Sequence, residues 1–409
     1  MSTHAPDAPV KSDVKDFTIA HDVLADAVAK VSRSAGNTGD LSRLRLVFAN
    51  SRLTVSASDL ELGATAKIPV TGKHGARAFV DAKLFGKVLG SIAADEVTLT
   101  VAKSTVTLKA DGYVAEFAST KGDTFALPHA PDTAAVKVNA VEFLAGAAAV
   151  SGAAASGDER PILTGVHLTD AAGSLAFTAT DSYRLARAIT PVPALGSSVL
   201  VPKRALVELS RMVGDADEID VSYDERSVLF VVGERQLVAQ LIEGEFPAVD
   251  QLVPDASKLP TAIAVNRLDT LAALRRVALM SSDDQNHAVK ITANTRGIVL
   301  TAVSASGADE VGQAREPIDG SYTGEKATVA YNAKYLAAGL ASFDEDELTL
   351  SVQGDGRPDL LHAGSPGERF YLLMPVKIGT AEAPQAVEDP ESDDDPEAET
   401  EEATEGADA

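Results

Sequence analysis

The side chains that usually carry enzymatic chemistry are few and scattered in this sequence of 409 residues. There is no cysteine, which excludes a disulfide, a thiolate metal site and a cysteine nucleophile. The histidines lack the spacing of metal ligands, and neither a glycine-rich phosphate loop nor a nucleophile motif is present. They are His4, His21, His74, His129, His167, His287 and His362. We therefore expect a protein that is not an enzyme and that uses no metal or cofactor.

One carboxylate has neighbours that could support acid–base chemistry. Asp181 is followed closely by Tyr183 and Arg184. A loop carboxylate in such a setting more often accepts backbone hydrogen bonds and caps a turn. We favour the turn, and an assay for divalent metal or nucleotide binding separates the two interpretations.

The net charge of −24 at pH 7 is distributed unevenly. The segment from Gly379 to Ala409 is rich in Asp and Glu, has no Lys or Arg, and lacks the apolar residues of a core. We expect residues 379–409 to form a disordered acidic tail, and residues 1–15 a disordered N-terminal tail. The rest of the chain is still acidic, so any contact with nucleic acid must use a local basic surface.

Between these tails the chain repeats one pattern three times. A strand pair with alternating apolar and polar residues reads "NSRLTVSASDLELGATAKI" from Asn50, "AAGSLAFTATDSYRLARAI" from Ala171 and "NTRGIVLTAVSASGADEVGQA" from Asn294. A short strand running into a helix reads "AFVDAKLFGKVLGSI" from Ala78, "VLVPKRALVELSRMV" from Val199 and "TVAYNAKYLAAGLASF" from Thr328. Another strand reads "DEVTLTV" from Asp95, "DEIDVSY" from Asp217 and "DELTLSV" from Asp346.

Each repeat also opens with a helix pattern, from His21, Asn139 and Asn266 respectively. Two helices and several antiparallel strands in each unit indicate an α+β fold of three domains, each an antiparallel sheet backed by two helices. Proline-containing joints follow Leu127 and Leu252. The predicted domains are residues 16–133, 134–258 and 259–378.

The second helix of each repeat places a basic residue at an equivalent position. With Leu84, Ala205 and Tyr335 in register, the expected apolar faces are Leu84, Val88 and Ile92; Leu206, Leu209 and Val213; and Tyr335, Leu340 and Phe343. The preceding residues, Lys83, Arg204 and Lys334, point away from those faces on the helical wheel, as do Arg211 and, on the first helix, Arg33. A solvated helix face explains each residue singly. Repetition in all three units favours a shared basic surface that meets phosphates without reading bases.

Five segments together give this chain a specific resemblance. They are "ERPILTGVHL" from Glu159, "ATDSYRLA" from Ala179, "EGEFPAVDQLVP" from Glu243, "YNAKYLAAGL" from Tyr331 and "YLLMPVKI" from Tyr371. In order and spacing they resemble the bacterial beta sliding clamps, the beta subunit of DNA polymerase III. The resemblance runs from about Phe17 to Ile378 and includes the threefold repeat.

The resemblance implies a DNA sliding clamp, a processivity factor in which two chains join head to tail into a ring around duplex DNA. It implies sequence-independent DNA contacts by inward basic residues. Together with those from the repeat register, the expected DNA-binding residues are Arg33, Lys83, Lys203, Arg204, Arg211, Arg276 and Lys334. By position it also implies that Phe117, Leu279 and Met280 are apolar members of the dimer interface.

The resemblance further implies a pocket between the second and third domains that receives short linear motifs. Its partners would be the DNA polymerase III catalytic subunit, the clamp loader, other polymerases and repair proteins. The matching positions are Leu163, Thr180, Ser182, Tyr183, Arg184, Leu185, Pro247, Leu252, Asn332, Tyr335, Leu372, Met374, Pro375 and Val376. Met374 suits such a site because methionine adapts to varied side chains.

Two features depart from the family pattern. The segment "AGNTGDLSRLRLV" from Ala35 lacks the proline-containing turn usual there, and an acidic extension follows the last strand. The alternative function is therefore a clamp-like binding module that has lost DNA loading. No apolar run is long enough to cross a membrane and no signal-peptide pattern opens the chain. We expect no membrane partner and a cytoplasmic, nucleoid-associated location.

Overall fold

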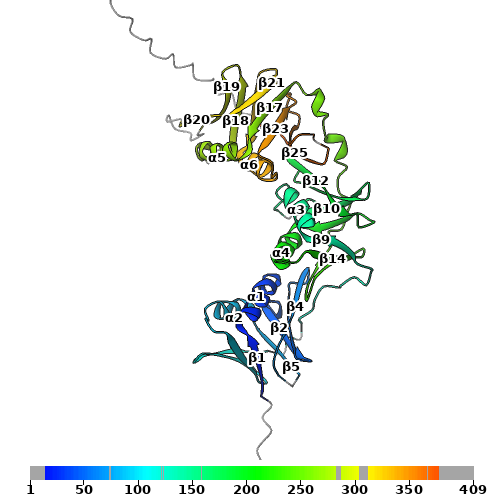
Figure 1. Cartoon of the computed structure of the whole chain (residues 1–409), viewed down its shortest axis with the longest axis vertical. Coiled ribbons are helices and arrows are strands. Elements are labelled where there is room, and N and C mark those ends of the chain that lie inside the picture. The colour runs from blue at the N-terminus through cyan, green and yellow to red at the C-terminus, as the bar shows by residue number, and fades with distance from the viewer. Residues whose placement is uncertain are drawn as a thin grey trace, which may run out of the picture. The chain divides into compact units, whose positions relative to one another are not determined.

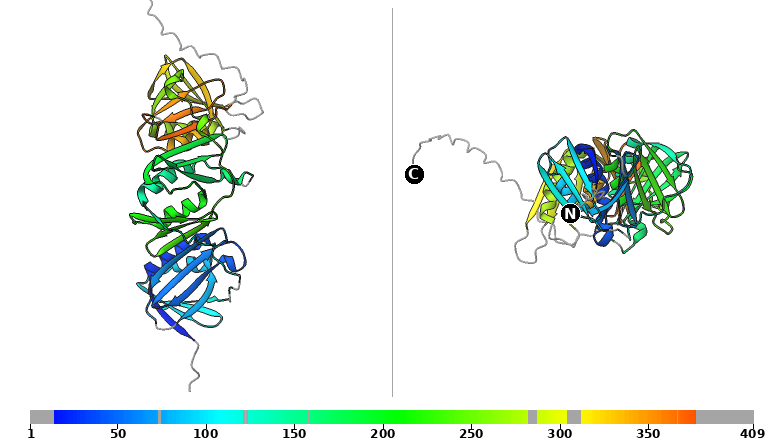
Figure 2. Two further views of the ribbon diagram at one scale, coloured as in Figure 1. Left: turned by 90° about the vertical axis from the view of Figure 1, so that its right-hand side faces the viewer. Right: turned by 90° about the horizontal axis from the view of Figure 1, so that it is seen from below.

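The computed structural model describes residues 14–376, apart from 73–74, 121, 123, 158, 282–286, 304–311 and 366. The predicted acidic tail and most of the N-terminal tail lie outside the described residues. Lys15, the last residue assigned to the N-terminal tail, begins the first strand. Figures 1 and 2 colour the three repeats from blue through green to orange.

Each repeat runs twice through the order strand, helix, three strands. The first repeat contains β1 (Lys15–Ala20), α1 (His21–Val31), β2 (Arg43–Ala49), β3 (Arg52–Ser58), β4 (Leu62–Pro69), β5 (Ala76–Asp81), α2 (Ala82–Leu89), β6 (Glu96–Val101), β7 (Thr105–Ala110) and β8 (Tyr113–Ala118). The second contains β9 (Val136–Asn139), α3 (Ala140–Ser151), β10 (Gly165–Ala171), β11 (Ser174–Thr180), β12 (Arg184–Pro193), β13 (Val199–Pro202), α4 (Lys203–Val213), β14 (Glu218–Tyr223), β15 (Ser227–Val232) and β16 (Arg235–Gln240). The third contains β17 (Thr261–Asn266), α5 (Arg267–Val277), β18 (Ala288–Asn294), β19 (Gly297–Val303), β20 (Gln313–Ile318), the additional β21 (Gly320–Gly324), β22 (Ala327–Asn332), α6 (Ala333–Ala341), β23 (Glu347–Val352), β24 (Asp359–His362) and β25 (Arg369–Leu373).

Short 3₁₀ turns connect these elements. They are η1 (Ser32–Ser34), η2 (Gly39–Ser42), η3 (Pro161–Leu163), η4 (Asp250–Leu252), η5 (Ala256–Lys258) and η6 (Ala278–Ser281). The α+β fold with two helices per repeat is confirmed, and the strand–helix unit occurs twice in every repeat rather than once.

The sheets are shared between neighbouring repeats. The strand orders are β1-β6-β7-β8, then β5-β2-β3-β4-β16-β15-β14-β9, then β13-β10-β11-β12-β25-β24-β23-β17-β21, and last β20-β19-β18-β22. β4 of the first repeat pairs antiparallel with β16 of the second, and β12 of the second pairs antiparallel with β25 of the third. Each joint therefore uses backbone hydrogen bonds that a loop contact could not supply.

Side chains fix where most helices begin. Asp81 accepts a hydrogen bond from Leu84 N, Asn139 from Glu142 N and Asn266 from Asp269 N. Asn332 accepts from the backbone of both Lys334 and Tyr335. Such N-caps satisfy helix N–H groups that have no partner within the helix. The two helices without a capping side chain, α1 and α4, follow Ala20 and Pro202.

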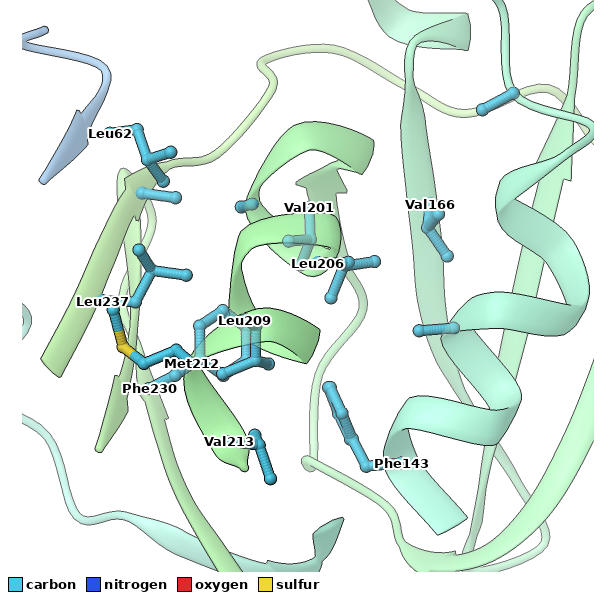
Figure 3. Packing of buried hydrophobic residues seen from close by; sticks show 14 of the residues in the cluster. Leu62, Phe143, Val166, Val201, Leu206, Leu209, Met212, Val213, Phe230 and Leu237 are labelled. Atoms are coloured by element: carbon cyan, nitrogen blue, oxygen red, sulfur yellow. The ribbon is translucent and has the colours of Figure 1, made fainter. Parts of the chain in front are cut away.

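The apolar face expected for α4 is confirmed. Leu206, Leu209 and Val213 are buried, and Figure 3 shows α4 packing toward Phe230 and Leu237 of the neighbouring strands. Burying one such side chain stabilises the fold by roughly 1.5–3 kcal/mol.

The face expected for α2 is wrong at Leu84, whereas Val88 and Ile92 are half-buried against the core as expected. Leu84 is 52% exposed, and the buried residues are Ala82, Phe85 and Leu89. Because the Asp81 cap starts this helix at Ala82, the first, fourth and eighth residues face the sheets. Leu336 and Leu340 occupy the same fourth and eighth places in α6, where they are buried as well.

Candidate functional site

The three basic residues aligned by the repeat occupy one equivalent place in the fold. Lys83, Arg204 and Lys334 are each the second residue of their helix, and each is exposed. The second residues of α1, α3 and α5 are Asp22, Val141 and Leu268, so this basic position belongs to the second helix of each repeat alone.

Nearby carboxylates neutralise several of the predicted DNA-binding residues. Arg204 pairs with Asp59. Arg211 and Arg33 both approach Glu208, the latter at 3.9 Å between Nε and Oε2. The sequence did not indicate Asp59, which lies far from α4 in the chain, whereas Glu208 stands three residues before Arg211 on α4.

Arg276 is neutralised in the same way. It donates from Nε to Glu316 Oε2 at 3.1 Å, and this hydrogen bond raises the pKa of the arginine. Its partner lies on β20, a different element from α5. The positive charge of this surface is therefore partly compensated before any ligand arrives.

Lys83 and Lys334 have polar neighbours other than carboxylates in the part of the chain that the structure describes. Lys83 Nζ donates to Asn37 Oδ1 at 3.4 Å, and Lys334 Nζ lies 3.3 Å from His287 Nε2. Among the residues that the structure describes, neither lysine forms an ion pair. They are the strongest candidates for phosphate contacts because no carboxylate that the structure describes competes for their charge.

Lys203 has a different environment from its neighbour Arg204. Both line a cavity of about 490 Å³ with Glu61 and Thr164. Burial, and then the charge of Arg184, lower the pKa of Lys203. The pKa of the Lys203 amino group therefore depends on the second site, which is built around Arg184.

That second site is a small hollow of about 70 Å³ between strands of the second and third repeats. Most of its lining was predicted from the sequence: Thr180, Ser182, Tyr183, Arg184, Leu185, Leu252, Leu372 and Met374. The sequence interpretation missed one lining residue, Pro358, which precedes β24. The turn-forming segment before this strand, "GDGRPD" from Gly354, was the only signal that could have drawn attention to it.

A tight turn presents the residues at the rim of the hollow. Asp181 Oδ1 accepts from the backbone N–H of Tyr183 at 3.0 Å and of Arg184 at 3.1 Å, while its Oδ2 accepts from Arg184 Nε at 2.9 Å. Asp181 therefore caps a turn, as favoured from the sequence. Ser182 has a positive φ of 79°, a conformation that costs a non-glycine residue energy and that the surrounding bonds must hold.

Charge and aromatic contacts hold Arg184 in place. Its guanidinium lies 4.3 Å from the ring centre of Tyr335, whose ring is stacked with that of Tyr183. Burial alone would lower the pKa of Arg184, but Tyr371 and Asp181 outweigh it and the pKa is raised. Burial raises the pKa of Tyr371 to about 12, so its hydroxyl stays protonated at neutral pH.

Strand pairing brings the separate segments of the hollow together. Leu185 of β12 is paired with Leu372 of β25, and Met374 N donates to Tyr183 O at 2.9 Å. Beside Pro358, the buried Asp359 accepts from Tyr331 Oη at 2.6 Å, which ties β24 to β22. Burial raises the pKa of this carboxyl group.

The remaining predicted pocket residues do not line the hollow. Leu163 is buried in η3, Pro247 is exposed in the loop after β16, and Asn332 caps α6. Tyr335 contacts the rim through Tyr183 and Arg184. Pro375 and Val376 follow the last strand, where Val376 N donates to Ala330 O.

The residues predicted for a dimer interface differ in exposure. Leu279 is 74% exposed, and Met280 is half-buried against the core. Phe117 is 4% exposed and packs edge-on against Phe85 with ring centres 5.1 Å apart. Phe117 can therefore support an interface only indirectly, by packing in the core of its own domain beneath the surface.

The three-repeat arrangement with shared sheets defines a clamp fold, and solved clamps have it. A DNA polymerase sliding clamp from Bacillus subtilis matches with a TM-score of 0.81 at 23% identity, over 89% of this chain and 100% of that one. A DnaN sliding clamp from Bartonella birtlesii bound to griselimycin matches with a TM-score of 0.81 at 22% identity, with the same coverage.

Sequence comparisons give the family. The model of the DNA polymerase III beta subunit central domain matches residues 137–248, and that of its C-terminal domain matches residues 251–377. The beta sliding clamp of Synechococcus elongatus is 29% identical over 80% of this chain and 88% of its own length. That of Bacillus subtilis is 26% identical over 88% of this chain and 99% of its own length. The chain belongs to the beta sliding clamp family.

Two further findings bear on the sequence interpretation. Within the described residues, no group of three or more His, Cys, Asp or Glu side chains is arranged to hold a metal ion. No described helix is both long and apolar enough to span a bilayer.

Proposed function

We propose that this protein is a DNA sliding clamp, a processivity factor that encircles duplex DNA and holds replication proteins on it. The way in which the repeats are joined carries the proposal. In the first and second repeats, the last strand of the first half pairs with the last strand of the second half of the next repeat, as in β4 with β16 and β12 with β25. The same rule, applied once more, pairs β20 with β8 of a second copy.

The ends of the sheets support this closure. β8 and β20 are the outer strands of two four-stranded sheets, and each pairs with a described strand on one side only. Unpaired edge strands carry free N–H and C=O groups and readily add another strand. Two copies joined head to tail would complete both edges and give a closed ring with Leu279 and Met280 near the joint.

Basic second residues on α2, α4 and α6 would hold DNA without reading its sequence. Side chains at equivalent places in every repeat meet an evenly charged phosphate backbone better than any one base sequence. Carboxylates beside Arg204 and Arg276 weaken this attraction, which suits a protein that must slide. A ring needs little direct affinity because it is held topologically.

The hollow beside Tyr183 is the proposed binding site for short peptide motifs of partner proteins. Leu185, Leu372 and Met374 offer an apolar floor, while the half-exposed Leu252 and the Asp181–Arg184 turn form the rim. An extended peptide with apolar anchors in such a small site would bind in the micromolar range, roughly −8 kcal/mol. The partners proposed are the polymerase III catalytic subunit, the clamp loader, other polymerases and repair proteins.

Two measurements test the proposal together. Sedimentation at micromolar concentration should give a dimer, and loaded protein should stay on nicked circular DNA and leave linear DNA from its ends. A monomer, or equal retention on the two DNA forms, would contradict it. The comparisons give no support to the alternative of a clamp-like module without DNA loading. We further propose that the protein acts without catalysis and resides in the cytoplasm at the nucleoid.

A further inference from the structure

Three arginines form a cluster on a sheet face that the functions above do not use. Arg43 and Arg45 lie on β2, and Arg77 lies on the neighbouring β5. Their side chains project from the face opposite Leu44 and Leu46, which are buried in the core. In the strand register Arg45 is opposite Phe79, and Arg77 is opposite Val47, so the three guanidinium groups share one face.

These arginines are only weakly compensated within the described residues, where hydrogen bonds from Thr124, and then the charge of Arg43, lower the pKa of Asp40. Among the described residues none of the three forms an ion pair, and the Nε atoms of Arg43 and Arg45 are buried without a hydrogen-bond partner. Burial, and then the charge of Arg77, lower the pKa of Arg45. Like charges held close together without compensation are unfavourable unless an anion joins them.

Two carboxylates beside Arg43 are already engaged. Asp40 accepts from both the N–H and the hydroxyl of Thr124, at 3.1 and 2.7 Å. Asp81 is opposite Arg43 in the register but accepts from Leu84 N at 2.8 Å as the cap of α2. The cluster therefore differs from Arg204 and Arg276, each of which has a carboxylate partner.

An aromatic side chain sets the direction of the central arginine. Arg45 lies 4.8 Å from the ring centre of Phe125, whose ring packs against Phe79 at 5.8 Å. A guanidinium stacked on a ring keeps its N–H groups free at the edge, where they bind carboxylates in a planar, bidentate manner. Three guanidinium groups on one sheet face, one of them stacked in this way, fit a ligand with several carboxylates better than one with a single charge.

We propose that this arginine cluster (Arg43, Arg45 and Arg77) is the docking site for the acidic C-terminal segment, residues 379–409, of this chain. The segment contains the run "EDPESDDDPEAETEE" from Glu388 and has no Lys or Arg. It follows closely on Val376, the last described residue. At up to ~3.3 Å per residue its length allows it to reach well beyond its own domain. The proposal does not depend on ring formation or DNA binding.

Fluorescence on the full chain tests the docking. Because the chain has no cysteine, Thr400→Cys accepts a single dye. At ~50 mM salt the anisotropy of the dye should be high, and at ~1 M salt, where charges are screened beyond about 3 Å, it should fall. Changing Arg43, Arg45 and Arg77 together to Gln should give the high-salt value already at low salt.

The matched control removes the same charge elsewhere. Lys83→Gln, Arg204→Gln and Lys334→Gln together should leave the anisotropy high at low salt. If this control frees the dye and the cluster variant does not, the segment docks on the helices and the proposal is wrong. An anisotropy that is low in the unchanged chain at both salt concentrations would also overturn it.

A second measurement does not require the arginine variant to fold correctly. A photo-crosslinking amino acid at Thr400 of the otherwise unchanged protein should join to β2, β5 or the segment around Phe125. Crosslinks confined to α2, α4 and α6, or to the hollow beside Tyr183, would exclude the arginine cluster as the docking site. Added peptide of residues 379–409 should compete with the crosslinks at the cluster.

Discussion

The peptide hollow and the helix surface are built in opposite ways. The hollow gathers side chains from several distant segments and holds them with strand pairs, the Asp181–Arg184 ion pair and buried contacts. The helix surface repeats one exposed residue on three helices, each in contact with the end of one described polar side chain. The first site therefore depends on geometry and the second on charge. Changes in the hollow should affect stability and binding together, whereas changes on the helices should affect binding alone.

The largest effect should come from the floor of the hollow. Leu185 is 3% exposed, and Leu185→Ala leaves a cavity between β12 and β25. We expect the free energy of unfolding to fall by roughly 2–5 kcal/mol, with a parallel loss of peptide affinity. Urea denaturation and peptide titration measure the two quantities. Unchanged stability with lost affinity would break the comparison, because the hollow would then not be part of the core.

Removing charge from the helices should have a large effect on DNA and almost none on the fold. We change Lys83, Arg204 and Lys334 together to Gln. The slope of the logarithm of the DNA-binding constant against the logarithm of the salt concentration should then become shallower by about three, one for each phosphate contact. The free energy of unfolding should stay within ~0.5 kcal/mol, since all three side chains are exposed. Lys258→Gln, at an exposed ion pair with Asp255, is the control for a general loss of charge. An unchanged slope means that these residues do not face DNA.

A smaller loss of peptide affinity is expected at the rim of the hollow than at its floor. Leu252 lines the hollow yet is 50% exposed. Leu252→Ala should weaken peptide binding about tenfold, or about 1.4 kcal/mol, and leave the unfolding transition in place. Isothermal titration beside a melting curve gives both numbers. A fall in stability as large as that of Leu185→Ala would mean that rim and floor are one structural unit.

The repeat and the hollow could be predicted because both leave a pattern in the sequence. Alternating strands and equivalent strand–helix steps identify the repeat without knowledge of contacts, and most lining residues lie in the segments that carried the family resemblance. The α2 face could not be predicted from apolar residues alone, because both Leu84 and Phe85 are apolar. The Asp81 cap decided which of them faces the core.

The pairing of Arg204 and Arg276 with carboxylates could not be predicted from the sequence for another reason. Asp59 and Glu316 pair with arginines on other elements, and nothing local marks them as partners. The same limit applies to Phe117, whose burial against Phe85 depends on the packing of α2 over β8. Pro358 was missed because a turn proline gives no sign of which cavity it borders.

The smallest effect concerns pH and should appear in the hollow but not on the helices. Asp359 is buried next to the lining residue Pro358, and its pKa lies above the ordinary value of 3.8 because of burial. The folded chain therefore holds this proton more tightly than the unfolded chain does. The resulting stability is present below the unfolded pKa and is lost as pH rises through the folded one.

Asp359→Asn should remove this dependence, at a cost on the order of 1 kcal/mol for an altered hydrogen bond in the low-pH range. The stability advantage of the unchanged chain over the variant should shrink as pH rises above 3.8. Tyr331→Phe should have the opposite effect, because Tyr331 donates to the carboxylate and partly opposes the rise in its pKa. Urea unfolding across pH measures both effects, and parallel curves for the three proteins would show that Asp359 does not titrate in this range.

Peptide binding should follow the same pH dependence, because Asp359 ties β24 to β22 beside the hollow. DNA retention at constant salt should not follow it. Among the described residues, no such buried carboxyl group lies beneath Lys83 or Lys334.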